Sequence, residues 1–286
     1  MSPTILNFGS CNIDHVYTVE AFVSPGETLS SGTYQTFPGG KGFNQSVAIV
    51  QAGGDCSHVG RIGRDGEWLK GMLRSLGINT DFLTVSTEPT GHAIIQINQE
   101  GENAIITHGG ANHTITQSEI DFALEGTKET DLVLIQNEIK NVGYIIERAK
   151  KKGLQVAFNA APINKGVENY PLDALDLLFL NEIEAEQLSG ATGTAEMIRA
   201  LSKRFPETKL IITLGGDGST YHYKNETHKQ IAIDPGQIVD TTGAGDTFVG
   251  TFLAYFVQSG RPREALMEAA KASARCISRK GATTLN

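Results

Sequence analysis

Several features that mark other classes of protein are scarce in this sequence. Its 286 residues include only three cysteines, at positions 11, 56 and 276, with neither metal-type spacing nor the even number that disulfide pairing needs. Asp and Glu outnumber Lys and Arg by 32 to 24, so the basic footprint of a nucleic-acid-binding protein is lacking. No apolar run approaches the roughly 18–20 residues of a membrane span, and the N-terminus lacks the regions of a signal peptide. We therefore expect a mildly acidic globular protein of the cytoplasm with reduced thiols, and neither nucleic acid nor membrane as a partner.

Two nucleotide-binding fingerprints are lacking as well. The dinucleotide pattern G-x-G-x-x-G occurs nowhere, so an NAD-dependent enzyme has no support. The stretch Gly39-Gly40-Lys41-Gly42 is not a Walker phosphate loop, because Lys41 is followed by Gly42 rather than by Ser or Thr. Its diglycine still lets the backbone approach a ligand closely, and Lys41 and Asn44 supply hydrogen-bond donors.

Short apolar runs alternate with helical stretches along much of the chain. We predict strands at residues 5–9, 132–136, 155–158, 177–180 and 210–214, and helices at 142–152, 182–189 and 195–204. Strands that alternate with helices at this pace pair in parallel through right-handed crossovers. The pattern predicts an α/β fold over residues 1–286 as a single domain, with a mostly parallel central sheet and helices on both faces.

Hydrogen-bonding or acidic residues follow these apolar runs. In an open parallel sheet, ligands bind beyond the carboxyl ends of the strands. One polar strand end is routine, whereas five together favour a binding site. The residues concerned are Asn12, Asp14, Asn137, Glu138, Asn159, Asn181, Glu184, Thr213 and Gly215.

Two stretches, residues 13–37 and 90–107, lack helical period and read as short strands with turns. Residues 92–97 and 103–107 flank a polar, Gly-containing turn at 98–102, which predicts a hairpin. We expect both stretches to form one small antiparallel β lid over the carboxyl edge of the sheet, where it would exclude water from a reaction. Alternatively, the two stretches form an ordinary extension of the sheet edge or a dimer contact. A lid can also serve as a dimer contact, and we expect a homodimer through the lid.

The stretch from Asp240 to Phe248 runs into a helix whose apolar residues recur every four positions. Gly243, Ala244 and Gly245 expose backbone N–H groups at the positive end of that helix, which favours a bound anion. Asp246 would repel a phosphate there unless it accepts a proton from an attacking hydroxyl. The alternative is a Gly-rich turn in which the aspartate merely caps the helix; we expect a threonine, 241 or 242, as the cap.

Four short motifs resemble the ribokinase family of carbohydrate kinases, in an order and at spacings that span almost the whole chain. Each motif is weak evidence alone, but four together make a strong signal. They are Gly9-Ser10-Cys11-Asn12-Ile13-Asp14, Gly39-Gly40-Lys41-Gly42-Phe43-Asn44, Asn181-Glu182-Ile183-Glu184 and residues 240–246, with a further match at Arg279-Lys280-Gly281-Ala282.

The resemblance implies a three-layer sandwich that transfers the γ-phosphate of ATP to a primary hydroxyl of a pentose, with D-ribose as the expected acceptor. Asp246 matches the catalytic base, and Gly243, Ala244 and Gly245 match the anion hole. The sugar is expected under the lid. The positions that match its contacts are Asn12, Asp14, Gly40, Lys41, Asn44 and Glu138.

The resemblance also implies the cofactor sites. Glu184, with Asn181, matches an Asn-x-x-Glu element that holds Mg²⁺ and phosphate largely through water. Asp240 and the Thr242 carbonyl match a site for a monovalent cation, expected to be K⁺. The sequence departs from the family near that site, since Leu285 stands where the family has a serine and relatives usually continue beyond Asn286. The positions that match the nucleotide pocket are Asn181, Thr213, Gly215 and Gly218.

Structural roles remain open for some of these residues. Asn12 and Asp14 could form a turn, Asn44 could cap the helix after the diglycine, and Asn181 with Glu184 could form a capping pair.

Other functions remain open too. A nucleoside or pseudouridine kinase of the same family would need an apolar platform for the base, for which Phe22, Phe37 and Phe43 are candidates, and a fructokinase is a further alternative. A sugar-phosphate kinase is disfavoured because residues 13–37 and 90–107 contain no Arg or Lys. A non-catalytic sugar sensor should have lost the base or the glycines, and all are present.

Overall fold

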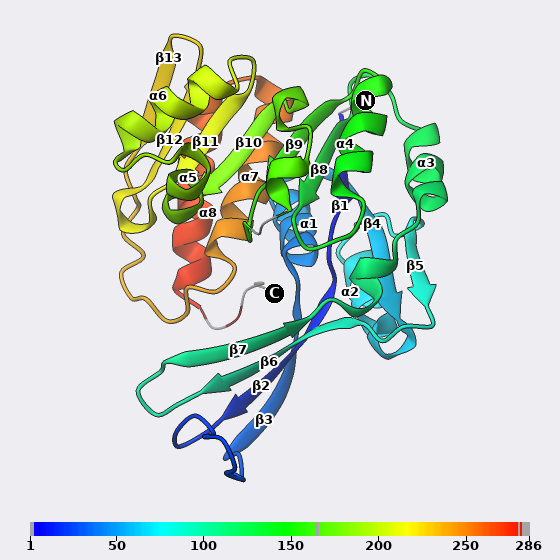
Figure 1. Cartoon of the computed structure of the whole chain (residues 1–286), viewed down its shortest axis with the longest axis vertical. Helices are drawn as coiled ribbons and strands as arrows, with labels where there is room; N and C mark the ends of the chain where they lie inside the picture. The colour runs from blue at the N-terminus through cyan, green and yellow to red at the C-terminus, as the bar shows by residue number, and fades with distance from the viewer. Residues whose placement is uncertain (1–2, 164–165, 280, 282–286) are drawn as a thin grey trace.

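The structure is a computed structural model that describes residues 3–163, 166–279 and 281 of the chain. Within these residues, the strands form two separate sheets (Figure 1). In the larger sheet, neighbouring strands pair in parallel except at one edge, where β11, β12 and β13 run antiparallel. Its spatial order is β13 (Glu226–Gln230), β12 (Ser219–Tyr223), β11 (Lys209–Thr213), β10 (Leu177–Asn181), β9 (Gln155–Asn159), β8 (Leu132–Gln136), β1 (Thr4–Phe8), β4 (Asp55–Gly63) and β5 (Leu83–Ser86).

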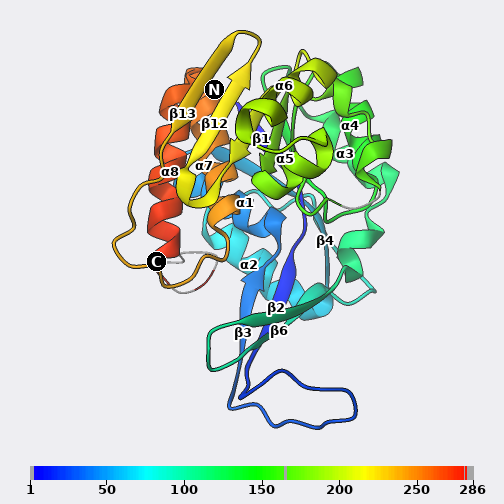
Figure 2. The same cartoon turned by 60° about the vertical axis from the view of Figure 1, so that its left-hand side comes forward.

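Helices cover both faces of the large sheet (Figures 1 and 2). One layer contains α1 (Lys41–Gln51), α2 (Glu67–Ser75), α7 (Ala244–Ser259) and α8 (Pro262–Ile277). The other contains α3 (Gln117–Glu125), α4 (Val142–Lys151), α5 (Glu182–Ser189) and α6 (Thr194–Arg204). Short 3₁₀ helices are η1 (Arg64–Gly66), η2 (Gly110–Thr114), η3 (Val167–Asn169), η4 (Leu172–Ala174) and η5 (Gly215–Asp217).

The side chains of each central strand alternate between two hydrophobic cores. In β8, Leu132 and Leu134 pack against the layer that contains α7, whereas Val133 and Ile135 pack against the layer that contains α4. A strand covered on both faces is apolar at most positions, which explains why the central strands appear in the sequence as nearly continuous apolar runs. The predicted α/β fold with helices on both faces is therefore confirmed.

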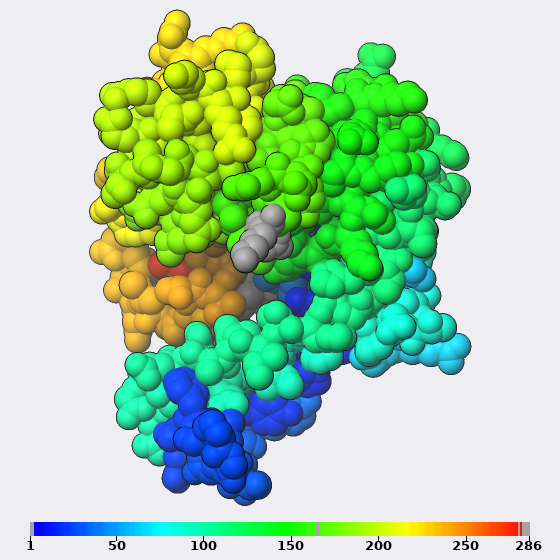
Figure 3. Space-filling model, in the orientation of Figure 1, coloured from blue at the N-terminus to red at the C-terminus, as the bar shows by residue number. Residues whose placement is uncertain are grey.

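The second, smaller sheet consists of β3 (Thr33–Gly39), β2 (Asn12–Thr18), β6 (Gly91–Ile97) and β7 (Asn103–His108), in that order. The two outer pairings are antiparallel, and β2 pairs with β6 in parallel. Strand β2 begins four residues after the end of β1, so the small sheet starts where β1 leaves the large one. It stands off from the body as a separate lobe (Figure 3). The predicted small separate sheet is confirmed, with the antiparallel pairing in its two outer pairs and a parallel pairing between β2 and β6 at its centre.

Most predicted elements agree with the structure to within one or two residues, and β8 and α5 agree at both ends. Strands β4, β5, β12 and β13 and helices α3 and α8 were not predicted. None of the helices among the described residues combines the length and the hydrophobicity that crossing a membrane requires.

Candidate active site

Helix α7 begins at a glycine turn. Gly243 is the N-terminal cap residue, with φ 76° in the left-handed region that glycine adopts without strain. Among the described residues, no side chain caps this end, so the prediction that Thr241 or Thr242 caps the helix is wrong. The Thr242 N–H instead donates to Asp240 Oδ1 at 2.9 Å. The lack of a side-chain cap leaves the start of α7 open to a ligand, although the Ala244 N–H already donates to the Thr241 carbonyl at 3.3 Å.

Asp246 lies in the first turn of α7 and is only 8% exposed. Gln45 Nε2 donates to its Oδ1 at 2.8 Å, and Asn44 Nδ2 approaches its Oδ2 at 3.4 Å. Its carboxylate therefore bonds to α1 side chains rather than to the N-terminus of its own helix, which argues against the capping alternative. Asn44 lies inside α1, whose N-cap residue is Gly40, so Asn44 does not cap that helix either.

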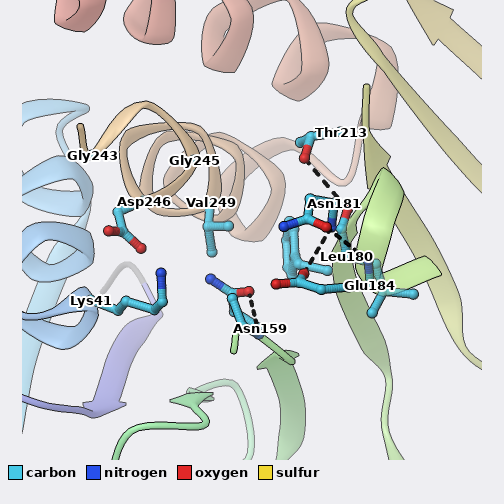
Figure 4. Close-up of a pocket in the computed structure, with 12 residues that line it drawn as sticks. Lys41, Asn159, Leu180, Asn181, Glu184, Thr213, Gly243, Gly245, Asp246 and Val249 are labelled. Carbon is cyan, nitrogen blue, oxygen red and sulfur yellow. Dashed lines mark hydrogen bonds between the residues drawn. The ribbon is translucent and has the colours of Figure 1, made fainter. Parts of the chain in front are cut away.

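Asp246 opens onto a pocket of about 150 Å³ at the carboxyl ends of β9, β10 and β11 (Figure 4). A Cβ atom built on Gly245 would meet no described atom within 4 Å, so a ligand has room to approach this backbone. The lining residues are Lys41, Asn159, Ala161, Phe179, Leu180, Asn181, Glu184, Thr213, Gly243, Gly245, Asp246 and Val249. Segments that are distant in the sequence thus meet in one polar cavity.

Lys41 lies between Asp246 and the acidic residues Glu138 and Glu184. Its side chain lines the pocket and points toward Asp246 (Figure 4). The charge of Asp246 raises the pKa of Lys41 against the opposing effect of burial, and Glu138 and Glu184 raise it further. Lys41 is therefore a firmly protonated cation among three carboxylates, Asp246, Glu138 and Glu184.

Asn181 and Glu184 form a reciprocal capping box at the start of α5. Asn181 Oδ1 accepts from the Glu184 N–H at 2.8 Å, and Glu184 Oε2 accepts from the Asn181 N–H at 2.9 Å. The structural alternative for this pair is thereby confirmed. Both residues also line the pocket, so capping positions the carboxylate that faces it. Burial raises the pKa of Glu184 against the bonds from Asn181 and the charge of Lys41, and Asp246 raises it further.

Glu138 and Asp14 form the acidic part of the predicted sugar site. Glu138 Oε2 accepts from Ser10 Oγ at 2.5 Å and from the Lys41 N–H at 3.0 Å, which fixes it against the start of α1. Burial and the charge of Glu138 raise the pKa of Asp14 to about 6. A Cβ on Gly39 would lie 2.2 Å from Asp14 Oδ2, so any larger residue where β3 passes this carboxylate would displace the Asp14 side chain.

Asn112 is a site residue that the sequence did not reveal. It is 2% exposed, and its Nδ2 donates to Asn12 Oδ1 at 2.7 Å and to the Cys11 carbonyl at 3.2 Å. Its Oδ1 accepts from the Cys11 N–H at 3.0 Å, so all its polar atoms are engaged. Because Asn12 Oδ1 accepts from Asn112, Asn12 is oriented to offer its amide N–H groups elsewhere.

Gly215 and Gly218, which were predicted to line the nucleotide pocket, are not among the residues that line the observed pocket. Gly215 begins η5, and a Cβ on Gly218 would lie 2.0 Å from the Gln230 carbonyl oxygen, so packing against β13 accounts for Gly218. Thr213 does line the pocket, and its Oγ1 donates to the Leu180 carbonyl at 3.5 Å. Phe43 is fully buried in the core and has no face left for a base, which removes it as a nucleoside platform; Phe22 and Phe37 are half-buried.

The predicted monovalent-cation residues lie on the loop before α7. Asp240 Oδ2 accepts from the Gly281 N–H at 3.0 Å, and the Thr242 carbonyl accepts from Cys276 Sγ at 3.6 Å. The loop is thus tied to the end of α8. Leu285, together with Lys280 and Ala282 of the late family match, lies outside the described residues.

Comparison with known proteins identifies the family. A model described as pfkB family carbohydrate kinase matches residues 2–286. The ribokinase of Arabidopsis thaliana is 35% identical over 294 residues, which cover 98% of this chain and 78% of that protein. The ribokinase of Haemophilus influenzae is 34% identical, with 99% and 94% covered. The solved structure of Arabidopsis thaliana ribokinase complexed with ribose and ATP has a TM-score of 0.88 at 31% identity, covering 98% of this chain and 94% of that chain.

This chain therefore belongs to the pfkB family of carbohydrate kinases. The resemblance read from the sequence motifs is confirmed over nearly the whole chain.

Proposed function

We propose that this protein is an ATP-dependent carbohydrate kinase that phosphorylates the primary hydroxyl of a pentose, with D-ribose as the acceptor. The observation that carries the proposal is the position of Asp246. Its buried carboxylate opens onto a polar pocket at the glycine turn that begins α7. Relatives named ribokinase, one of them solved with ribose and ATP, support ribose as the acceptor.

In this mechanism, Asp246 accepts the proton of the sugar hydroxyl as the oxygen attacks the γ-phosphorus. The bond from that phosphorus to ADP breaks, and ADP leaves with the bridging oxygen. The N–H groups at Gly243, Ala244 and Gly245 face the charge on the transferred group. Lys41 adds a fixed positive charge beside Asp246.

The donor set fits magnesium held mainly by the nucleotide. In the part of the chain that the structure describes, no cluster of three or more His, Cys, Asp or Glu could hold a metal ion alone. Glu184 and Asn181 at the pocket are adequate for Mg²⁺, which keeps several waters and takes few protein ligands. When bound, the ion neutralises charge on the phosphate oxygens.

The nucleotide is expected to lie beyond the ends of β10 and β11, against Asn181, Thr213 and the loops at Gly215 and Gly218. Potassium is the cation we assign to Asp240 and the Thr242 carbonyl. Because that loop leads directly into the anion hole, an ion there would act by ordering the Gly243 turn. Turnover in KCl is therefore expected to exceed turnover in tetramethylammonium chloride of equal ionic strength.

On the other side of Asp246, the sugar would lie against Asn12, Asp14, Gly40, Lys41, Asn44 and Glu138. Convergent donors and acceptors suit neighbouring hydroxyls of a polyol. The small sheet would close over the sugar and exclude the water that otherwise hydrolyses ATP.

Two further assignments concern the whole molecule. Exposed apolar side chains on one face of the small sheet, the cross-strand partners Ile94 at 38% and Ile106 at 68%, favour a homodimer through the lid. Light scattering of wild type and Ile106→Glu tests this, and the variant is expected to shift toward monomer. The buried thiols of Cys11 and Cys56 suit a reducing compartment such as the cytoplasm.

The proposed activity is tested by ADP release in ATP, magnesium and potassium. Ribose, 2-deoxyribose, fructose, adenosine and pseudouridine are compared with a reaction that lacks an acceptor. We expect ribose to give the highest kcat/KM. A preference for adenosine or pseudouridine would replace the pentose by a nucleoside. The absence of acceptor-dependent ADP release with every compound would overturn the kinase assignment in favour of a sugar sensor.

A further inference from the structure

A chain of buried polar side chains runs from Asp246 into the middle of the large sheet. It crosses from helix α7 to α1 and then to strands β8, β1 and β4. Each member beyond Asp246 is 0% exposed, although buried polar groups lower stability unless they are fully hydrogen-bonded. In order, the members are Gln45, Gln136, Asn7, Ser46 and His58.

Among the five members of this hydrogen-bond network, only Gln45 contacts Asp246 in the described structure, through the 2.8 Å bond from Nε2 to Oδ1. The two residues are 201 positions apart, and the close packing of α1 against α7 brings them together. Gly250 permits that packing, because a Cβ there would lie 2.6 Å from both Ala48 Cβ and the Gln45 carbonyl oxygen.

The direction of each hydrogen bond in the chain follows from two fixed acceptors. An ionised Asp246 only accepts, so Gln45 must donate to it and must turn its carbonyl toward Gln136. At the other end, the Gly42 carbonyl only accepts, so Asn7 Nδ2 must donate to it, at 2.8 Å, and Asn7 Oδ1 must accept from Gln136. Both ends require the same orientation of Gln136, with Nε2 donating to both neighbours at 2.7 Å.

This arrangement leaves one buried acceptor without a hydrogen bond among the described residues. Gln136 Oε1 has no partner, and Gly9 leaves the space around it, since a Cβ there would lie 2.4 Å from that oxygen. An apolar side chain at position 136 would remove this unpaired oxygen but would leave the amide oxygens of Gln45 and Asn7 without the bonds from Gln136 Nε2. Gln136 therefore stays polar because it satisfies both neighbours, and these bonds fix the amide orientation of Gln45.

We infer that Gln45 is a positioning residue for the proposed catalytic base. It makes the shorter of the two amide contacts to Asp246, 2.8 Å to Oδ1 against 3.4 Å from Asn44 Nδ2 to Oδ2. The bond to Oδ1 fixes the rotation of the carboxylate, and the weakly held Oδ2 is the atom that takes the proton of the sugar hydroxyl. Lys41 does not replace it, because an ammonium attracts the carboxylate without fixing its plane. The inference rests on the proposed function for its kinetic consequence, but the orientation of Asp246 can be measured independently of any substrate.

The test compares Gln45→Met with Gln136→Met. Both substitutions replace a fully buried glutamine by an apolar side chain of similar length, and only the first removes a bond to Asp246. We expect Gln45→Met to lower kcat by about 10- to 100-fold while KM for ribose and ATP stays within about threefold, because misplacing a reacting group mainly affects the chemical step. Gln136→Met is expected to keep kcat within about threefold, since Gln45 still donates to Asp246.

Melting temperatures of both variants separate positioning from simple loss of stability. Equal losses of kcat in the two variants, or a normal kcat in Gln45→Met, would overturn the inference. Gln45→Asn gives a second reading if the methionine variant does not fold, because its amide is one methylene too short to hold Oδ1, and it too is expected to lose kcat.

A crystal structure of Gln45→Met, or of Gln45→Asn, decides the point even if no sugar is phosphorylated by the wild type. A carboxylate of Asp246 that is rotated or split between rotamers supports the inference. A carboxylate in its wild-type orientation contradicts it, whatever the acceptor proves to be.

Discussion

The start of α7 and the small sheet both belong to the candidate active site, but they are held in different ways. At α7, Asp246 and its partners Asn44 and Gln45 are at most 8% exposed, and they bond across two packed helices. In the small sheet, β3 is exposed at its first four positions and β7 at all but one. The sheet is held by its backbone ladders, by its junction with β1 and by cross-strand side-chain pairs such as Tyr17 with Tyr34 and Thr18 with Thr33.

This contrast predicts how substitutions divide between kinetic constants. Groups fixed by packing are already in place before substrate arrives, so their loss should lower kcat. Under the proposed function, the groups on the small sheet and at its junction with β1 contact only the sugar, so their loss should mainly raise KM for the sugar. The following predictions test that division, from the largest effect to the smallest.

Asp246→Asn should have the largest effect. The variant keeps the shape of the side chain but loses the proton acceptor, so we expect kcat to fall by at least about 100-fold. ATP binding, measured by calorimetry, should stay within about threefold. The matched control is Asp234→Asn, which alters an exposed carboxylate in the preceding loop and should leave turnover unchanged. Near-normal turnover in Asp246→Asn would remove this residue from the role of base.

Asn112→Asp should show the opposite kinetic pattern with a smaller effect. The carboxylate can still accept from the Cys11 N–H but no longer donates to Asn12 Oδ1, so Asn12 loses its orientation. We expect KM for the sugar to rise by about 3- to 10-fold, with KM for ATP and kcat little changed. A change in kcat without a change in the sugar's KM would show that the junction does more than hold Asn12.

The pH dependence of sugar binding should show the smallest effect. Asp14 has a raised pKa of about 6, so its carboxylate is ionised at pH 7.5 and is protonated progressively as the pH falls through that value. The ionised form is the stronger acceptor for a sugar hydroxyl, so KM for the sugar should rise by a few fold between about pH 7.5 and 5. Asp14→Asn should have a higher KM at pH 7.5 and a flatter profile. A wild-type KM that is constant over this range would contradict the assignment of Asp14.

The same raised pKa has a consequence for stability. Because Asp14 binds its proton more tightly in the folded state than in the unfolded state, its ionisation disfavours folding as the pH rises from about 4 to 6. Asp14→Asn should therefore raise the melting temperature at pH 7.5 more than at pH 4. The ionised form of Asp14 therefore favours sugar binding but lowers the stability of the fold, a trade-off that is common at functional sites.

Local pattern explains which features could be predicted from the sequence. The apolar run at β8 and the four-residue apolar repeat of α7 reflect burial on one or both faces, so they survive in the sequence as periodicity. The capping box of Asn181 and Glu184 depends on a spacing of three residues, which is visible without any tertiary information. Strand β4 escaped prediction because its Gly, Ser, His and Arg residues interrupt the apolar run.

The bond between Gln45 and Asp246 and the bond between Asn112 and Asn12 left no such signal. Each joins side chains at least 100 residues apart, and each depends on how two elements pack. Phe43 shows the opposite error. The sequence made it a candidate platform for a nucleoside base, but the packing of the fold buries it completely.

The sequence by itself determined the layered α/β fold, the small separate sheet and the glycine turn with its aspartate, because these follow from hydrophobic period and from backbone chemistry within a few residues. Only the tertiary structure decided which amides orient Asp246 and Asn12, and that Lys41 lies among three carboxylates. Such contacts form when distant elements pack together, and a hydrogen bond between them has no period along the chain.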